Sequence, residues 1–324
     1  MRNIVILVDR LEETLLSASP AGRYKILGRI VSRSACSNSN RQPLRKSLFH
    51  VFGLDEEQGA APFNMLADGL LPGNDYYMHA DPVSLYVDMA RVFITHWGAT
   101  ELASSDREAL AVTLFDHFKA EQMRLHTPTA KRWYLRAKAS NGPGFPPPDE
   151  ALGMDIGELL PDRPEAGFWK TRLNECQMIL HDHPVNQRLC TQHQPVVNSL
   201  WFWGGGKLPE PPAGDIPGVV LANDSLSRGL ARWASVPVVN DFRQMLMQPT
   251  PNDGLVVFSA AAGEQAHMLK QLEQFMAWPL DALKNRQIDR LTLQGNQLRF
   301  DLERKDWRAI WRRRNFTQLA SRLK

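Results

Sequence analysis

A run of five apolar, mostly β-branched residues occupies positions 4–8 and is followed directly by Asp9. A short continuous run of this kind predicts a strand buried on both faces, as in a parallel sheet. Two further runs, at 218–221 and 255–259, are each followed by a helical pattern. Strands that alternate with helices predict a doubly wound α/β sheet, which places its sites at the carboxyl ends of its strands.

A segment with a different order of elements interrupts this alternation. Its patterns follow the order ββαββ, at residues 83–87, 91–94, 105–118, 123–126 and 132–137. Such an order is typical of an α+β unit rather than of a parallel sheet. We therefore expect a discontinuous α/β core formed by residues 1–80 and 150–324, with an inserted α+β domain at 81–149.

The last part of the predicted core has a third pattern. Alternating apolar residues on both sides of Gly295-Asn296 predict a β-hairpin. Residues 307–314 then combine Trp and Ile at helical spacing with several arginines, which predicts an amphipathic helix. We expect this hairpin and helix to complete the core.

Charge is unevenly distributed along the chain. The 38 Lys and Arg residues nearly balance the 35 Asp and Glu residues, for a net charge of +3. Yet residues 23–46 hold seven basic residues and no acid, and residues 299–324 hold nine basic residues against three acids. The second block fits the outer face of a docked helix. The first has little apolar periodicity, so we interpret it as a surface segment, mobile or partner-binding.

Cysteine content indicates a reducing compartment, and hydropathy indicates a protein without a membrane span. Cys36, Cys176 and Cys190 are far apart and form no CxxC motif, which argues against a disulfide framework or a structural zinc site. The first apolar run is too short for a signal peptide, and no apolar run reaches 18 residues. We therefore expect a cytoplasmic protein without a membrane span.

Three carboxylates lie near predicted strands. Phosphotransfer at a binuclear site needs several carboxylates and histidines at strand ends, with a Ser or Thr nucleophile. Asp9, Asp224 and Asp253 are the candidates by position, and Ser225 stands beside Asp224, although helix capping also explains that pair. His267 lies within a helical pattern, where a solvated histidine is the simpler interpretation. This set is too sparse to predict a metal site.

A glycine-rich stretch, Gly204-Gly205-Gly206-Lys207, follows another apolar run. Glycines allow backbone N–H groups to approach an anion closely. However, neither the GxxxxGK[ST] nor the GxGxxG pattern is present. A tight turn at the end of a strand and a ligand-binding loop both remain open as interpretations.

Several separated motifs carry a family resemblance. They are NECQMILHDHPVN at 174–186, PVVNSLWFWGGG at 195–206, ADPVSL at 80–85, RWYL at 132–135 and WRAIWRRR at 307–314. The chain resembles the RpfE-type regulatory proteins of bacteria. That family is in turn similar to the archaeal-type cofactor-independent phosphoglycerate mutases.

This resemblance implies an alkaline-phosphatase-like core with an inserted α+β domain. In the mutases, a serine accepts phosphate beside two divalent metals such as Mn²⁺ or Mg²⁺. Asp9 corresponds to a first metal-binding aspartate, but Arg10 replaces the glycine after it, and the stretch 259–267 lacks the aspartate of a late DEAGH-like motif. The Arg expected three positions after Asn186 is absent, and Arg188 stands one position earlier.

These departures favour a non-catalytic regulatory or scaffold protein without a cofactor. We expect it to bind a small anionic metabolite or a protein partner. The predicted ligand-binding residues are Asp81, Asn186, Arg188, Asn198, Trp203, Gly204, Gly205 and Gly206. A metal-dependent phosphoglycerate mutase or phosphatase is the first alternative. Nucleic-acid binding through the basic segments is the second and less favoured one.

Overall fold

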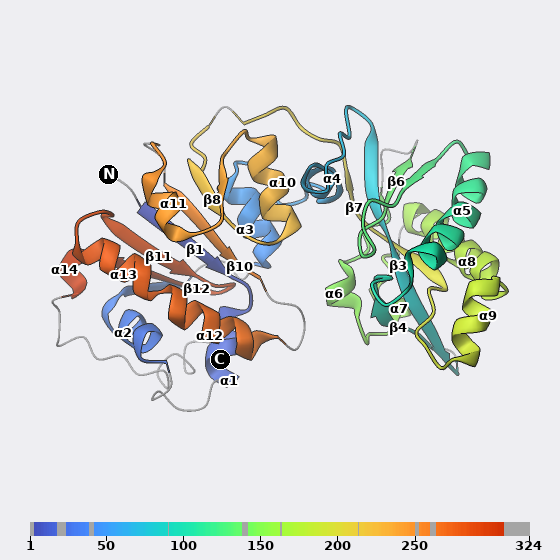
Figure 1. The fold of residues 1–324 in the computed structure, drawn as a ribbon, viewed down its shortest axis with the longest axis horizontal. Helices are drawn as coiled ribbons and strands as arrows, with labels where there is room; N and C mark the ends of the chain where they lie inside the picture. The colour runs from blue at the N-terminus through green and yellow to red at the C-terminus, as the bar shows by residue number, and fades with distance from the viewer. Residues whose placement is uncertain are drawn as a thin grey trace. The chain divides into compact units, whose positions relative to one another are not determined.

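The protein is described by a computed structural model that covers residues 3–17, 24–38, 42–89, 91–137, 142–162, 164–212, 214–249, 253–259 and 264–307. The chain divides into two compact units (Figure 1). Unit 1 combines Met1–Glu57 with Pro211–Lys324, and unit 2 is Gln58–Glu210. The inserted unit is therefore longer than the expected segment 81–149, and it extends beyond that segment on both sides.

Unit 1 is built on a seven-stranded sheet with the order β2-β12-β11-β1-β10-β8-β9. Its strands are β1 (Asn3–Val8), β2 (Ala35–Asn38), β8 (Val219–Leu221), β9 (Val238–Val239), β10 (Gly254–Phe258), β11 (Arg290–Gln294) and β12 (Leu298–Glu303). The five strands from β11 to β9 are parallel, while β12 and β2 are antiparallel. The mixed α/β class is thus confirmed, and the predicted strands near residues 4–8, 218–221 and 255–259 are present.

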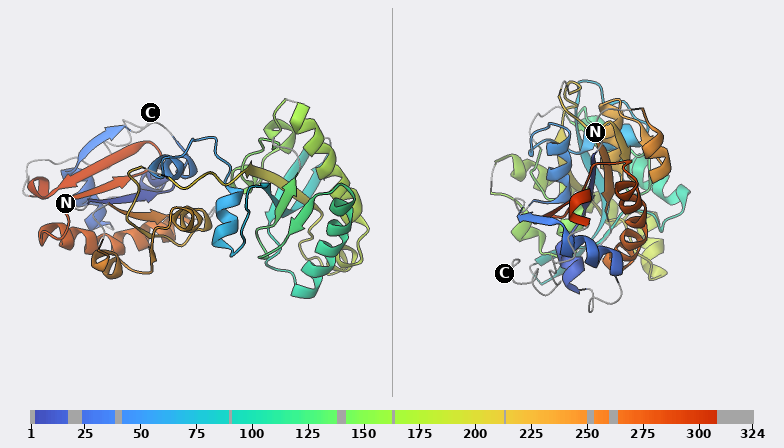
Figure 2. Two further views of the ribbon diagram at one scale, coloured as in Figure 1. Left: turned by 90° about the horizontal axis from the view of Figure 1, so that it is seen from above. Right: turned by 90° about the vertical axis from the view of Figure 1, so that its left-hand side faces the viewer.

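Helices cover both faces of this sheet (Figure 2). They are α1 (Leu11–Ser17), α2 (Lys25–Arg33), α3 (Leu44–Val51), α10 (Ser225–Trp233), α11 (Phe242–Met247), α12 (Gln265–Phe275), α13 (Ala277–Lys284) and α14 (Arg304–Trp307). Ile4 and Ile6 of β1 and Leu291 and Leu293 of β11 are fully buried in one apolar cluster. The continuous apolar runs form these strands because both faces of the sheet are removed from water.

The basic block at 23–46 is more ordered than its composition suggests. Helix α2 buries Leu27, Ile30 and Val31 in the core of unit 1. In its first turn, the backbone N–H groups of Ile26 and Leu27 donate to the carboxylate of Glu273 in α12, at 2.7 and 2.8 Å. The expectation that this block lacks an apolar pattern was wrong, because the apolar side chains recur at helical spacing between the basic ones.

The predicted hairpin is confirmed. Strands β11 and β12 pair in antiparallel register, with Leu293 opposite Phe300 and Leu291 opposite Leu302. Helix α14 begins directly after β12. The rest of the predicted amphipathic helix, residues 308–314, lies outside the described residues.

Unit 2 contains a five-stranded antiparallel sheet centred on one long strand. The strands are β3 (Tyr76–Asp88), β4 (Arg91–Trp97), β5 (Arg124–His126), β6 (Tyr134–Ala137) and β7 (Ser199–Gly206). One edge of β3 pairs with β6 and then with β4, whereas β7 pairs with β3 from Tyr77 to Val83. The strand near residue 200 was expected in the α/β core. It belongs instead to unit 2, which explains why the inserted unit extends to Glu210.

The helices of unit 2 are α4 (Ala61–Ala67), α5 (Ser104–Ala120), α6 (Pro148–Ala151), α7 (Ile156–Leu159), α8 (Pro164–His181) and α9 (Pro184–Thr191). Leu110, Leu114 and Phe118 of α5 are fully buried, as their spacing predicts. The Trp169 and Phe202 rings lie 5.1 Å apart, which packs α8 against β7. No helix within the described segments is long and apolar enough to cross a membrane.

Candidate functional site

Two of the three candidate metal ligands lie at the carboxyl edge of the unit 1 sheet. Asp9 follows β1, and its backbone N–H donates to the carbonyl of Phe258 at 2.9 Å. Asp224 follows β8, which is separated from β1 by β10. At a strand spacing of about 4.8 Å, two strand positions correspond to roughly 10 Å. The two carboxylates therefore share an edge of the sheet but come from strands that are not neighbours.

Asp253 lies at the opposite edge. It precedes β10, and Gly254 is in register with Ile4 near the start of β1. Its carboxylate accepts the backbone N–H of Asn3 at 3.0 Å and the Asn3 side-chain amide at 3.1 Å. Asp253 is thus level with position 3, six residues before Asp9 along the strand direction, or roughly 20 Å away at 3.3 Å per residue. Asp253 and Asp9 cannot bind one metal ion in this fold.

Asp224 already has a structural role. Its carboxylate accepts the backbone N–H of Ser227 at 2.8 Å and caps α10. Burial raises the pKa of Asp224, because desolvation disfavours the charged form. This capping role is the simpler of the two interpretations that the sequence left open for Asp224 and Ser225.

The described residues at the carboxyl edge of unit 1 do not fit a two-metal site. His267 is exposed on α12 and lies 3.0 Å from the side-chain amide of Gln271. Residues 260–263, within the stretch that corresponds to the DEAGH-like motif, lie outside the described residues. A binuclear centre needs its ligands to converge on ions about 4 Å apart, and Asp9, Asp224 and Asp253 are spread over both edges.

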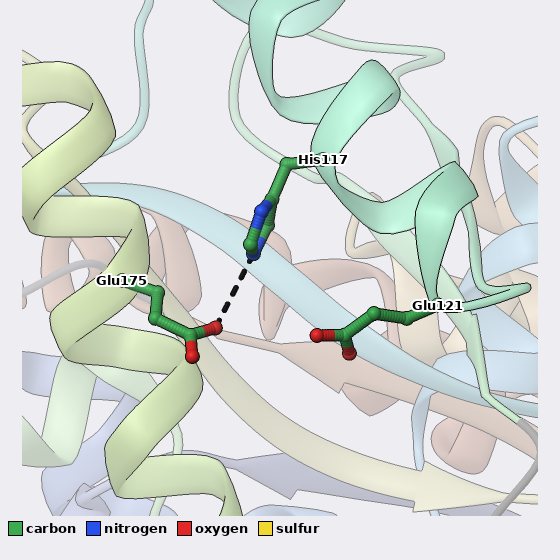
Figure 3. Close-up of side chains that lie close together, drawn as sticks. All are labelled: His117, Glu121 and Glu175. Atoms are coloured by element: carbon green, nitrogen blue, oxygen red, sulfur yellow. Dashed lines mark ion pairs between the residues drawn. The ribbon is translucent and has the colours of Figure 1, made fainter.

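A group with metal-ligand chemistry occurs in unit 2 instead. Within the described ranges, His117, Glu121 and Glu175 are the one set of at least three such residues whose ligand atoms lie within 4.8 Å of one another (Figure 3). His117 Nε2 lies 3.3 Å from Glu175 Oε2. A guanidinium fills this group, because Arg172 pairs with Glu121 Oε1 at 2.7 Å and also with Glu175. We interpret the group as an ion-pair cluster between α5 and α8.

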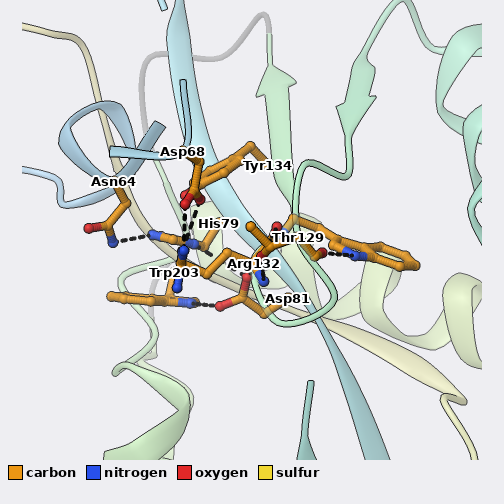
Figure 4. Close-up of polar contacts among 9 residues, drawn as sticks. Asn64, Asp68, His79, Asp81, Thr129, Arg132, Tyr134 and Trp203 are labelled. Atoms are coloured by element: carbon orange, nitrogen blue, oxygen red, sulfur yellow. Dashed lines mark hydrogen bonds and ion pairs between the residues drawn. The ribbon is translucent and has the colours of Figure 1, made fainter. Parts of the chain in front are cut away.

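The predicted ligand-binding residue Asp81 lies at the centre of a buried polar network (Figure 4). Its carboxylate accepts the backbone N–H of Trp133 at 3.0 Å and the indole N–H of Trp203 at 2.8 Å. His79 Nδ1 lies 3.3 Å from Asp81, and the imidazole stacks on Trp203 with ring centroids 4.1 Å apart. Asp81 and His79 are fully buried. The structure thus brings Asp81 and Trp203 together, with their polar atoms bound to the protein itself.

A second carboxylate belongs to the same region. Asp68 accepts from Arg132 Nε at 2.9 Å and from the Tyr134 hydroxyl at 2.6 Å. Burial and the hydrogen bond to Asp68 raise the pKa of Tyr134, and that pairing also raises the pKa of Arg132. The Tyr134 and His79 rings lie 4.8 Å apart, which joins the two groups. Sequence reasoning did not identify Asp68, since its partners lie more than 60 positions away.

The three glycines form the end of strand β7, and they allow a close approach of two backbone segments. Gly204 has a φ of +60°, a conformation that favours glycine. A Cβ atom on Gly59 would collide with the carbonyl of Gly205. Gly206 is still in register with Tyr77 of β3. These contacts support a packing role for the glycine stretch.

The remaining predicted ligand-binding residues lie elsewhere in unit 2. Asn186 is buried and donates to the carbonyls of Leu180 and Val197, both at 2.8 Å. Asn198 exchanges two hydrogen bonds with the backbone of Leu85 and so extends the β3 ladder. Arg188, 49% exposed, pairs with Asp106 of α5 at 2.6 Å. The structure does not bring these three side chains into one cleft with Asp81.

Each unit has a cavity lined by described residues. The larger, about 460 Å³, opens at the amino edge of the unit 1 sheet. It is lined by Asn3, Val5, His50, Val51, Asp215, Ile216, Pro217, Asp253, Gly254 and Leu255. The smaller, about 160 Å³, lies at the start of α5 beside Thr129 and Trp133. Sequence reasoning missed His50 and Asp215, which come from segments without a motif.

The chain has distant relatives among known proteins, although no protein-family model matches it. A 2,3-bisphosphoglycerate-independent phosphoglycerate mutase of Methanosarcina barkeri is 27% identical over 152 residues, which cover 45% of this chain and 38% of that protein. The corresponding Methanosarcina acetivorans protein is 22% identical over 201 residues, with coverages of 58% and 49%. The chain thus spans half or less of these relatives.

A solved structure shows the same fold over most of the chain. The PH0037 protein from Pyrococcus horikoshii aligns with a TM-score of 0.60 at 12% identity, covering 93% of this chain and 87% of that one. This likeness concerns the fold alone. The sequence matches carry the relationship, and over about half its length this chain is a distant relative of the 2,3-bisphosphoglycerate-independent phosphoglycerate mutases.

Proposed function

We propose that this chain is a non-catalytic descendant of a phosphoglycerate-mutase-like protein, with a regulatory or scaffold role. One observation carries the proposal. The carboxylates at positions 9, 224 and 253, the best candidates for metal ligands, lie on both edges of the sheet, and two of them are engaged in structural hydrogen bonds. The resemblance to RpfE-type regulatory proteins and the expected alkaline-phosphatase-like core agree with this proposal and remain predictions.

The chemistry explains why this spacing matters. A two-metal site stabilises both the attacking and the leaving oxygen, and this requires ligands that converge from several strands. A carboxylate that caps a helix or holds a strand end cannot move to a metal without leaving backbone N–H groups unpaired. If Asp224 bound a metal, the backbone N–H of Ser227 would lose its acceptor, and if Asp253 did so, the backbone N–H of Asn3 would lose its acceptor.

Turnover measurements test the proposal directly. The full chain is incubated with Mn²⁺ or Mg²⁺ and either 3-phosphoglycerate or a generic phosphate ester. We expect no turnover above the blank, and no difference between the wild type and Asp9→Ala. Metal-dependent turnover that disappears in Asp9→Ala would establish the alternative, an active mutase or phosphatase. Asp55→Ala, which removes an exposed carboxylate that is not a candidate metal ligand, is the matched control.

For the ligand, we propose a small anionic metabolite or a protein partner in a cytoplasmic setting. Arg188 is the predicted ligand-binding residue with the most accessible charge, although Asp106 competes for it. Equilibrium dialysis with 3-phosphoglycerate should detect binding that weakens in Arg188→Ala but not in Arg91→Ala, an exposed arginine of the same unit. Equal binding by all three proteins would argue against this residue. Nucleic-acid binding would instead appear as steeply salt-dependent DNA affinity.

A further inference from the structure

Glu12 is a buried carboxylate at the carboxyl edge of the unit 1 sheet. It lies in the first turn of α1 and is 3% exposed. Its oxygens accept three successive backbone N–H groups, from Asn296 at 3.1 Å, Gln297 at 2.8 Å and Leu298 at 2.7 Å. Successive N–H groups that point to one position form a concavity which binds anions.

The location of this concavity is relevant to ligand binding. The three N–H groups belong to the turn between β11 and β12, and β11 runs parallel to β1 with Gln294 beside Leu7. The turn therefore lies at the carboxyl ends of the parallel strands, where open α/β sheets hold their ligands. Here the anion that these N–H groups bind is the carboxylate of Glu12, from the same chain.

Contacts other than Glu12 also hold the turn in shape. The side-chain oxygen of Asn296 accepts the backbone N–H of Arg10 at 3.3 Å, and its carbonyl accepts the backbone N–H of Gln42 at 3.0 Å. The backbone N–H of Gly295 also donates to the carbonyl of Leu298 at 2.9 Å, within the turn itself. The three N–H groups should therefore stay convergent when the carboxylate is removed.

We propose that the turn at 295–298 is an anion-binding site for a carboxylate, and that Glu12 occupies it within the same chain. A small external carboxylate binds there when the Glu12 side chain is absent. While Glu12 is in place, a phosphorylated or carboxylated metabolite has no access to these donors. The inference does not depend on whether the chain has phosphomutase activity.

Chemical rescue by formate tests the proposal on the full chain. Glu12→Ala should lower the melting temperature by roughly 5 °C or more and speed amide hydrogen exchange in the hairpin at 291–302. Sodium formate should reverse both effects saturably, whereas sodium chloride at equal ionic strength should not. Glu13→Ala, which removes the neighbouring exposed carboxylate, should behave as the wild type with either salt.

A second variant covers the case in which Glu12→Ala does not fold. Glu12→Gln keeps the side-chain volume but loses the charge, so amide exchange at 296–298 should be faster than in the wild type and insensitive to formate. Wild-type protection in Glu12→Gln would overturn the proposal. So would a formate effect of equal size in the wild type, Glu12→Ala and Glu13→Ala.

Discussion

Glu12 and Asp224 of unit 1 and Asp68 of unit 2 are carboxylates that accept from different kinds of donor. In unit 1, Asp224 accepts a backbone N–H of the helix it caps, and Glu12 accepts three backbone N–H groups of one turn. In unit 2, Asp68 accepts from the side chains of Arg132 and Tyr134. A backbone N–H donor is available at nearly every position of the sequence, whereas a side-chain donor requires a particular residue type at its position.

This difference predicts different costs of mutation. Removing a carboxylate in unit 2 leaves a buried charge or polar side chain unpaired, which is expensive. Removing one in unit 1 leaves backbone N–H groups that neighbouring atoms or water can partly satisfy. The comparison therefore predicts a ranking of stability effects.

The largest effect is expected for Asp68→Ala. The substitution leaves the largely buried Arg132 guanidinium and the Tyr134 hydroxyl without their acceptor, so the free energy of unfolding should fall by roughly 3 kcal/mol or more. Urea unfolding of the full chain measures this. The matched control is Asp75→Ala, which breaks a half-exposed ion pair with Arg136 in the same unit and should cost less than about 1 kcal/mol. Equal losses of unfolding free energy in Asp68→Ala and Asp75→Ala would show that the buried side-chain pairing of Asp68 contributes no more than an exposed ion pair.

Asp81→Asn should have the next largest effect. The amide of Asn would place a donor among the N–H donors of Trp133 and Trp203, so one of them loses its acceptor. We expect the free energy of unfolding to fall by about 2 kcal/mol, together with a change in Trp fluorescence. Asp88→Asn, at the exposed end of the same strand, should be neutral. A neutral Asp81→Asn would show that the network adjusts.

Arg172→Ala tests the ion-pair cluster between α5 and α8. Arg172 is 16% exposed and separates Glu121 from Glu175, so its removal leaves two neighbouring carboxylates beside His117. We expect a loss of about 1–2 kcal/mol and new Zn²⁺ binding, detected as a rise in melting temperature. The double variant with His117→Ala should not bind Zn²⁺. Equal Zn²⁺ binding by the wild type would contradict a guanidinium-filled cluster.

The smallest effect is expected for Asp224→Asn. Burial raises the pKa of Asp224, so the folded protein retains this proton at a pH where the unfolded chain has lost it, and stability falls as pH rises above the ordinary pKa of aspartate. Asn caps helices as well as Asp and does not ionise. The variant should match the wild type in acid and be slightly more stable at pH 7. Asp224→Ala should cost about 1 kcal/mol in acid and less at pH 7, because the wild type has by then lost part of its stability whereas alanine does not titrate. Unfolding curves at several pH values separate these outcomes.

Local patterns predict much of the fold. The run at 4–8, the Gly295-Asn296 turn and the spacing of Leu110, Leu114 and Phe118 each depend on neighbours a few positions away, and each element is present. The limits of the inserted unit were not predicted, because they depend on the pairing of β3 with β7 across about 120 positions. Nothing in the sequence near Trp203 indicates that it joins β3 rather than the parallel sheet.

The candidate site was less predictable for the same reason. Asp253 precedes its strand, so its place at the amino edge follows once β10 is known to be parallel to β1. Asp81 and Trp203 were both predicted to bind a ligand. Their hydrogen bond to each other depends on the long-range pairing of β3 with β7. Glu12 carries no motif, and its role becomes visible only when the hairpin turn is seen beside α1.

The glycine contact between residues 59 and 205 has an evolutionary consequence. The segments that enter and leave unit 2 meet there, and Gln58 donates a hydrogen bond to the carbonyl of Lys207 at 3.0 Å. When the two ends of an insertion lie close together, the domain that receives it needs only a loop that spans a short gap. The entropy cost of closing such a loop is small. Residues 58–210 thus have the form of a transferable module. A lineage could gain, lose or exchange it without changing the unit 1 sheet, which is formed by the chain before and after it.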